Sequence, residues 1–100
     1  MKFKKNVTVI FNEWALTCFA ACDKVWAGLG EVEPTCTSGI EGAHGENSFH
    51  YRGLAWDFRM PTIPDKIIPT LKLELGYTYQ VIKEGDHIHV EFDPPMRRGL

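Results

Sequence analysis

The sequence carries no large excess of charge, and this limits its partners. Its 100 residues include 11 Lys and Arg against 13 Asp and Glu, a formal net charge of -2. The basic residues lie mainly near the two ends, at Lys2, Lys4, Lys5, Arg97 and Arg98. Binding to a phosphate backbone requires Lys and Arg clustered on one surface. We therefore expect no nucleic-acid partner and interpret the basic ends as solvated.

Long hydrophobic runs are also missing. A basic start is followed by apolar residues, but Asn12 and Glu13 interrupt them too early for a signal peptide. No segment approaches the roughly 20 apolar residues of a membrane-spanning helix. We expect no membrane insertion, and a protein that stays in the cytoplasm unless another agent releases it.

Cysteines are few and odd in number. Cys18 and Cys22 lie four residues apart in a segment expected to be helical, and they could join Cys36 in a structural metal site. Buried free thiols in a reducing compartment are the commoner case. We interpret all three as core residues.

The order of the expected elements predicts a single α+β domain over residues 1–100. Residues 7–10 form a short segment rich in β-branched side chains, which predicts an edge strand. Asn12 is a candidate N-cap, and apolar residues recur at helical spacing from Trp14 to Trp26, so a helix should follow and end at Gly28 or Gly30.

The second half of the chain predicts two more strands, a helix and a hairpin. Strands are expected at 34–38 and 54–60, separated by a glycine-rich loop at 39–45. A helix is expected at 64–75, where Pro69 should break or restart it. Residues 77–83 and 87–92 should form a hairpin around residues 84–86. The predicted fold is a small, mostly antiparallel sheet packed against one long helix and a shorter helix.

Two short segments concentrate the residues that carry chemistry. Residues 48–57 hold His50 and Asp57, and residues 86–91 hold His87 and His89. Asp57 lies in an otherwise apolar strand, where a buried carboxylate needs a partner charge or a metal. A catalytic zinc ion takes three His or carboxylate ligands and keeps one open position. The pattern therefore indicates a metal site on the sheet, with ligands from two elements.

These segments also carry a family resemblance. Ser48-x-His50-x-x-Gly53-x-Ala55-x-Asp57, followed by Asp86-His87-Ile88-His89-Val90-Glu91, resembles the signature of the M15 family of zinc peptidases, above all its short phage and prophage members. The resemblance covers nearly the whole chain. It implies one zinc ion held by His50, Asp57 and His89, with Asp86 as general base.

The roles of the residues around this triad stay open at this point. Asp86 can reach the metal site only if it lies in the turn or at a bulge, since in a regular strand it would point away from His89. Glu84 is the alternative base, and Glu91 is a candidate hydrogen-bonding partner for a ligand histidine. His87 shares the face of His89 and could stabilise an oxyanion.

Four further residues are candidates for binding substrate. Arg59 shares the face of Asp57 and could clamp a carboxylate, with a surface salt bridge as the equal alternative. Ser48 could fix the loop before His50, and His44 could line the cleft or simply be exposed. Many members of the family have an arginine after the Thr-Ser-Gly turn, where this chain has Ile40-Glu41. Arg52 or Arg59 could replace it.

The resemblance implies a monomeric peptidase that hydrolyses the stem peptides of bacterial peptidoglycan, with a lytic phage or prophage role. Without an export signal it would reach the wall after release from the cell or as a virion component. A D,D-carboxypeptidase that removes terminal D-Ala is the alternative enzyme. A catalytically inactive, zinc-stabilised binding or structural module is the alternative outside enzymes.

Overall fold

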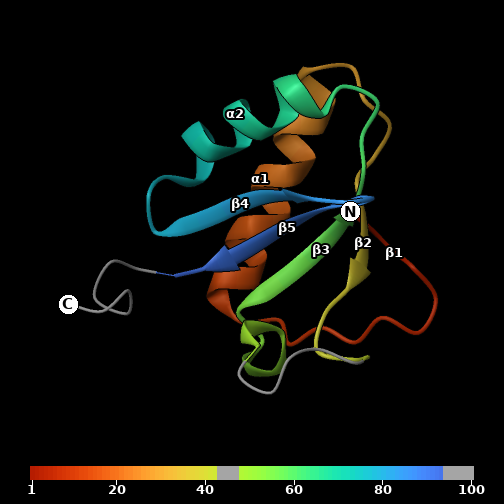
Figure 1. The fold of residues 1–100 in the computed structure, drawn as a ribbon, viewed down its shortest axis with the longest axis vertical. Coiled ribbons are helices and arrows are strands. Elements are labelled where there is room, and N and C mark those ends of the chain that lie inside the picture. The colour runs from red at the N-terminus through yellow and green to blue at the C-terminus, as the bar shows by residue number, and fades with distance from the viewer. Residues whose placement is uncertain (43–47, 94–100) are drawn as a thin grey trace.

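The computed structural model describes residues 1–42 and 48–93. Its elements confirm the α+β prediction, with a five-stranded, mostly antiparallel sheet and two α-helices (Figure 1). In chain order these are β1 (Lys2–Phe3), α1 (Glu13–Gly28), β2 (Thr35–Ser38), a 3₁₀ helix η1 (Phe49–Arg52), β3 (Ala55–Arg59), α2 (Pro64–Leu75), β4 (Tyr79–Glu84) and β5 (His87–Phe92).

The strands are ordered β1-β2-β3-β5-β4, so β3 and β5 lie at the centre of the sheet although α2 and β4 separate them in sequence. β1 is parallel to β2, and all other neighbours are antiparallel. Asp57 pairs with His89 across β3 and β5, and Arg59 pairs with His87. Directly paired residues share one face of a sheet, so this register gathers the residues predicted for the site.

Helix α1 begins where the sequence predicts. The Asn12 side chain accepts a hydrogen bond from the backbone N–H of Ala15 at 2.8 Å and so caps the helix. Its amide group also donates to the Gly53 carbonyl at 2.9 Å, which ties the start of the helix to the start of β3. Among the residues described, no helix is long and apolar enough to cross a membrane.

The prediction that Pro69 breaks the second helix is wrong. α2 runs without interruption from Pro64 to Leu75 and contains Pro69 in its interior. Pro69 lies on the exposed side, where water can satisfy the carbonyl that loses its intrahelical partner. The hydroxyl of the next residue, Thr70, donates to the Lys66 carbonyl at 2.8 Å.

The predicted edge strand at residues 7–10 is also wrong. The edge beside β2 is taken by β1, and Asn6 then adopts a left-handed conformation (φ 72°) that turns the chain away. Residues 7–10 run past the end of β2 and contribute one backbone–backbone hydrogen bond there, from the Ile40 N–H to the Thr8 carbonyl at 2.9 Å. Gly39 permits this approach, because a Cβ there would lie 2.1 Å from the Thr8 oxygen.

The central strands have two different faces. One packs against α1, where Phe19 and Trp26 contact the rings of Trp56 and Phe58. Figure 1 is viewed from the other face, with α1 passing behind the strands. The three cysteines are fully buried in the core, as predicted, and burial raises the pKa of the Cys36 thiol to about 12.

Candidate metal centre

His50 is placed by a local structure that the sequence analysis did not predict, the 3₁₀ helix η1. Ser48 caps it, with its hydroxyl oxygen accepting from the His50 N–H at 3.2 Å, so the expected loop-fixing role of Ser48 has a concrete contact. Gly53 ends it in the left-handed conformation (φ 69°), which favours glycine. The chain then enters β3, and His50 is only 4% exposed.

Asp57 and His89 reach the same point from the two central strands. The Asp57 Oδ1 atom lies 2.9 Å from His89 Nδ1 and 3.4 Å from His50 Nε2. The two ring nitrogens lie 3.3 Å apart. The Asp57 and His89 side chains are only 14% and 12% exposed. The three residues predicted as ligands thus form a largely buried group that could hold a metal ion.

Each histidine ring is oriented by a second partner. His50 Nδ1 lies 2.9 Å from the Gly39 carbonyl, which can only accept, so Nδ1 carries a proton and Nε2 faces the other two residues. His89 Nε2 lies 2.8 Å from Glu91 Oε1 and donates to it, which leaves Nδ1 facing Asp57. Glu91 thus has the contact that the sequence analysis proposed for it. Such outer partners fix the orientation of ligand histidines.

The electrostatics favour positive charge between the three side chains. Burial alone would raise the pKa of Asp57, but the imidazoles of His50 and His89 outweigh it and hold that pKa well below its usual value. Burial likewise lowers the pKa of His89, but its hydrogen bonds to Asp57 and Glu91 raise the pKa to about 9. Without a metal, His89 therefore donates a proton toward Asp57, and that proton lies where the donor atoms converge.

The donor set fits a zinc ion. Tetrahedral angles and Zn–N and Zn–O bonds of about 2.0–2.1 Å place neighbouring donors about 3.3 Å apart. The separations here are 3.3, 3.4 and 2.9 Å, the shortest being the Asp57–His89 hydrogen bond that a cation would replace. Two imidazoles and one carboxylate match the ligand preference of zinc and leave a fourth position open.

His87 lies next to the triad, and Asp86 lies next to His87. His87 Nε2 is 3.7 Å from Asp57 Oδ1, and His87 Nδ1 is 3.0 Å from Asp86 Oδ1. Asp86 lies in the two-residue turn before β5, so the condition that it must be outside the regular strand is met. Its side chain is fully exposed, and the hydrogen bond with His87 lowers its pKa. Glu84 Oε2 lies 3.9 Å from His87 Nε2.

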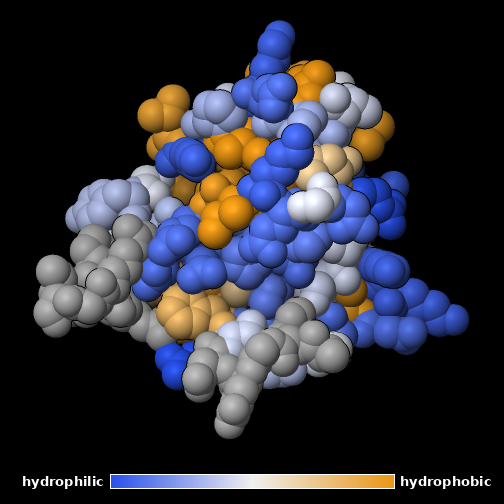
Figure 2. Space-filling view, in the orientation of Figure 1, coloured by the Kyte–Doolittle hydropathy of each residue, from blue (hydrophilic) through white to orange (hydrophobic). Residues whose placement is uncertain are grey.

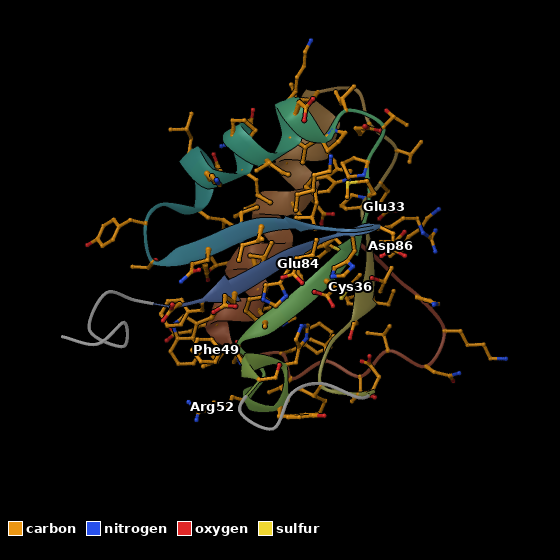
Figure 3. All side chains as sticks on the ribbon, in the orientation of Figure 1. Glu33, Cys36, Phe49, Arg52, Glu84 and Asp86 are labelled. Carbon is orange, nitrogen blue, oxygen red and sulfur yellow. The ribbon has the colours of Figure 1, made fainter. Side chains whose placement is uncertain are left out.

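A pocket opens beside Asp57 on the face away from the helices, where hydrophilic side chains dominate the view (Figure 2). Arg59 contributes to it, and so does Lys4, which the sequence analysis interpreted as part of a solvated end. Arg52 instead lies over the Phe49 ring, 5.7 Å from its centroid, at the opposite end of β3 from the hairpin tip that carries Asp86 (Figure 3). His44 is outside the described residues.

Glu41 is a residue whose role the sequence analysis missed. Its carboxylate accepts from the Gly39 N–H at 2.8 Å, the Thr8 N–H at 2.9 Å and the Ser38 hydroxyl at 3.0 Å. These bonds fix the loop whose Gly39 carbonyl orients His50. The sequence signal was only the absence of an arginine at this place, which carries no information about what a glutamate does there.

No protein-family model matches the chain, and no curated protein matches it.

Proposed function

We propose that the protein is a zinc-dependent peptidase that hydrolyses peptide bonds in the stem peptides of bacterial peptidoglycan. The observation that carries this proposal is the convergence of His50 Nε2, Asp57 Oδ1 and His89 Nδ1, with the second nitrogen of each ring hydrogen-bonded elsewhere. The peptidase chemistry and the substrate come from the resemblance to the M15 family, on the residues that form this group.

The residues around the triad have roles in this proposal. Zinc, when bound, would supply a Lewis acid that polarises a carbonyl and makes water more acidic. Asp86 would accept a proton from the attacking water and return it to the leaving amine. His87 holds Asp86 through Nδ1 and directs Nε2 toward the triad, where it can donate to the developing oxyanion.

The test combines metal analysis with product analysis. The protein is purified without chelators, and zinc is measured by atomic absorption; we expect one zinc per chain. Purified peptidoglycan is then incubated with the protein, and the released amino groups and fragment masses are recorded. Matched samples treated with EDTA, with and without added zinc, serve as controls. If the purified protein lacks stoichiometric zinc, the proposal is contradicted.

The fragment masses separate the alternatives. Internal cleavage of stem peptides supports the lytic peptidase, whereas release of D-Ala alone identifies a D,D-carboxypeptidase. One observation favours a third possibility, a zinc-stabilised binding module: the proposed base Asp86 is fully exposed and is held only by His87 among the described residues. Stoichiometric zinc with no new amino groups from any peptidoglycan type would establish that module.

A further inference from the structure

The pocket beside the triad is built from four parts of the chain that are distant from one another in sequence. Its walls come from the residue after β1, from the middle of β2, from β3, and from the turn before β5 together with the first residue of β5. The lining residues are Lys4, Thr37, Asp57, Arg59, Asp86 and His87. Asp57 belongs to the triad, so whatever occupies this pocket lies directly beside the proposed metal.

Backbone geometry directs two of these residues into the pocket. β2 pairs with β3 through Cys36–Phe58 and Ser38–Asp57, which leaves Thr37 as one extra residue in β2. Such a bulge re-aims a side chain. The Lys4 N–H donates to the Cys36 carbonyl at 2.9 Å, which places Lys4 alongside Thr37. On the other side, Arg59 is paired with His87.

The charges of the pocket are unevenly paired. Asp57 is engaged by the imidazoles of His50 and His89, and Asp86 by His87 at 3.0 Å. Within residues 1–42 and 48–93, neither Lys4 nor Arg59 forms a hydrogen bond or ion pair through its side chain. The salt bridge weighed for Arg59 in the sequence analysis is therefore absent from this part of the chain. Two unpaired cations face one exposed carboxylate.

We propose that this pocket binds a carboxylate of the substrate, with Arg59 as the principal contact and Lys4 as the second. The proposal rests on the proposed peptidase function and specifies its substrate as a peptide with a free carboxylate close to the scissile bond. Because His50 and His89 engage Asp57, the two cations Lys4 and Arg59 remain against one carboxylate, Asp86, and this excess of one positive charge suits a monoanion. A guanidinium can bind a carboxylate through two parallel hydrogen bonds, and the Thr37 hydroxyl is an additional donor.

Binding is tested without turnover, on the EDTA-treated full chain, by NMR titration. The probes are N-acetyl-L-alanyl-D-glutamic acid, its α-amide, its side-chain amide and its diamide. We expect the diacid to bind roughly tenfold more tightly than the diamide, as one charge-assisted contact allows. Whichever monoamide loses this preference identifies the carboxylate that is bound.

Variants assign the effect to residues. Arg59→Ala should weaken diacid binding roughly tenfold and leave diamide binding unchanged. Lys4→Ala should weaken it about threefold, because Lys4 is exposed to solvent. Lys5→Ala removes a neighbouring exposed lysine outside the pocket and should change nothing. All three side chains are exposed, so folding is retained.

Three results would overturn the carboxylate site: no preference for the diacid, an equal loss for diacid and diamide in Arg59→Ala, or an equal effect of Lys5→Ala. The outcome is independent of catalysis. An Arg59-dependent preference in a protein that releases no amino groups from peptidoglycan would support the site and contradict the peptidase. Hydrolysis that is unchanged in Arg59→Ala, with no diacid preference, would support the peptidase and contradict the carboxylate site.

Discussion

The two faces of the β3–β5 pair are built from alternate residues of the same two strands, yet they have different roles. On the covered face, Trp56, Phe58, Ile88 and Val90 are almost completely buried against the helices. On the open face, the register pairs Asp57 with His89. A strand reverses its side-chain direction at every residue, so each position is committed either to packing or to chemistry.

This arrangement explains how a chain of 100 residues can hold a precise site. Small domains bury a modest share of their surface and have little stability to spare. Here the most deeply packed strands are also the ones that carry the charged group, so the core that stabilises the fold also fixes the donor atoms. If the two faces are this separate in function, substitutions on each should have separable effects.

The largest effect is expected on the open face, for His89→Ala. Loss of one of three proposed ligands should abolish stoichiometric zinc binding and reduce hydrolysis by at least about a thousandfold, since several kcal/mol of transition-state stabilisation disappear with the metal. Zinc content and amino-group release are the measurements, with far-UV circular dichroism as the check on folding. Ile82→Thr is the matched control, because Ile82 is the partner of His89 on β4 and is 39% exposed. Full zinc occupancy in His89→Ala would exclude the triad as the metal site.

On the covered face, Phe58→Ala should destabilise the whole molecule. Phe58 is fully buried and contacts Phe19 and Trp26, and truncating such a residue costs about 3–5 kcal/mol. Zinc binding should be lost together with folding. Urea unfolding gives the free energy directly, and Phe58→Leu, which leaves a smaller cavity, should lose much less. A variant that stays stable but binds no zinc would mean that the two faces are not separable.

Asp86→Asn tests the base without touching the triad. It should lower kcat by about a hundredfold, as expected for loss of a general base, while zinc content and stability stay unchanged. Glu84→Gln is the matched comparison, since Glu84 also approaches His87. If Glu84→Gln produces the larger loss of kcat, Glu84 is the general base and Asp86 is not.

Much of this architecture follows from local patterns. The helical period from Trp14 to Trp26, the cap at Asn12 and the alternation in β3 correctly predict α1, its start and the two faces of the sheet. The three proposed ligands were found because two motifs contain them, and the structure brings them together. These features depend on neighbours within a few residues, and such features are readable in a sequence.

Two of the errors, at residues 7–10 and at Lys4, share one physical cause, which is contact between distant segments. Residues 7–10 have strand composition, but β1 occupies the edge and the turn at Asn6 diverts the chain. Lys4 borders the pocket only because β1 pairs with β2 in parallel. No pattern within either segment encodes these pairings.

Glu41→Gln examines such a long-range contact, and its effect should be the smallest of the four. Burial alone would raise the pKa of Glu41, but the hydrogen bonds from Thr8, Gly39 and Ser38 outweigh it and lower the pKa below the ordinary value of 4.5. A depressed carboxylate pKa contributes stability that is present above the unfolded value and is lost as the pH falls through the folded value. At pH 7 the substitution should therefore cost about 1 kcal/mol, the amount by which a charge-assisted hydrogen bond exceeds the neutral one that glutamine can still accept.

The pH dependence identifies the carboxylate as the cause. In urea unfolding, the difference between wild type and Glu41→Gln should be constant above about pH 5 and shrink as the pH falls below 4.5. Glu74→Gln is the control, because the exposed Lys24–Glu74 pair at 2.8 Å should contribute less than about 0.5 kcal/mol. Zinc affinity should also fall roughly tenfold in Glu41→Gln, since the Gly39 carbonyl that orients His50 is less firmly held. A loss of stability without any loss of zinc affinity would show that Glu41 stabilises the fold only. The loop that contains Gly39 would then have no effect on the metal site of the open face.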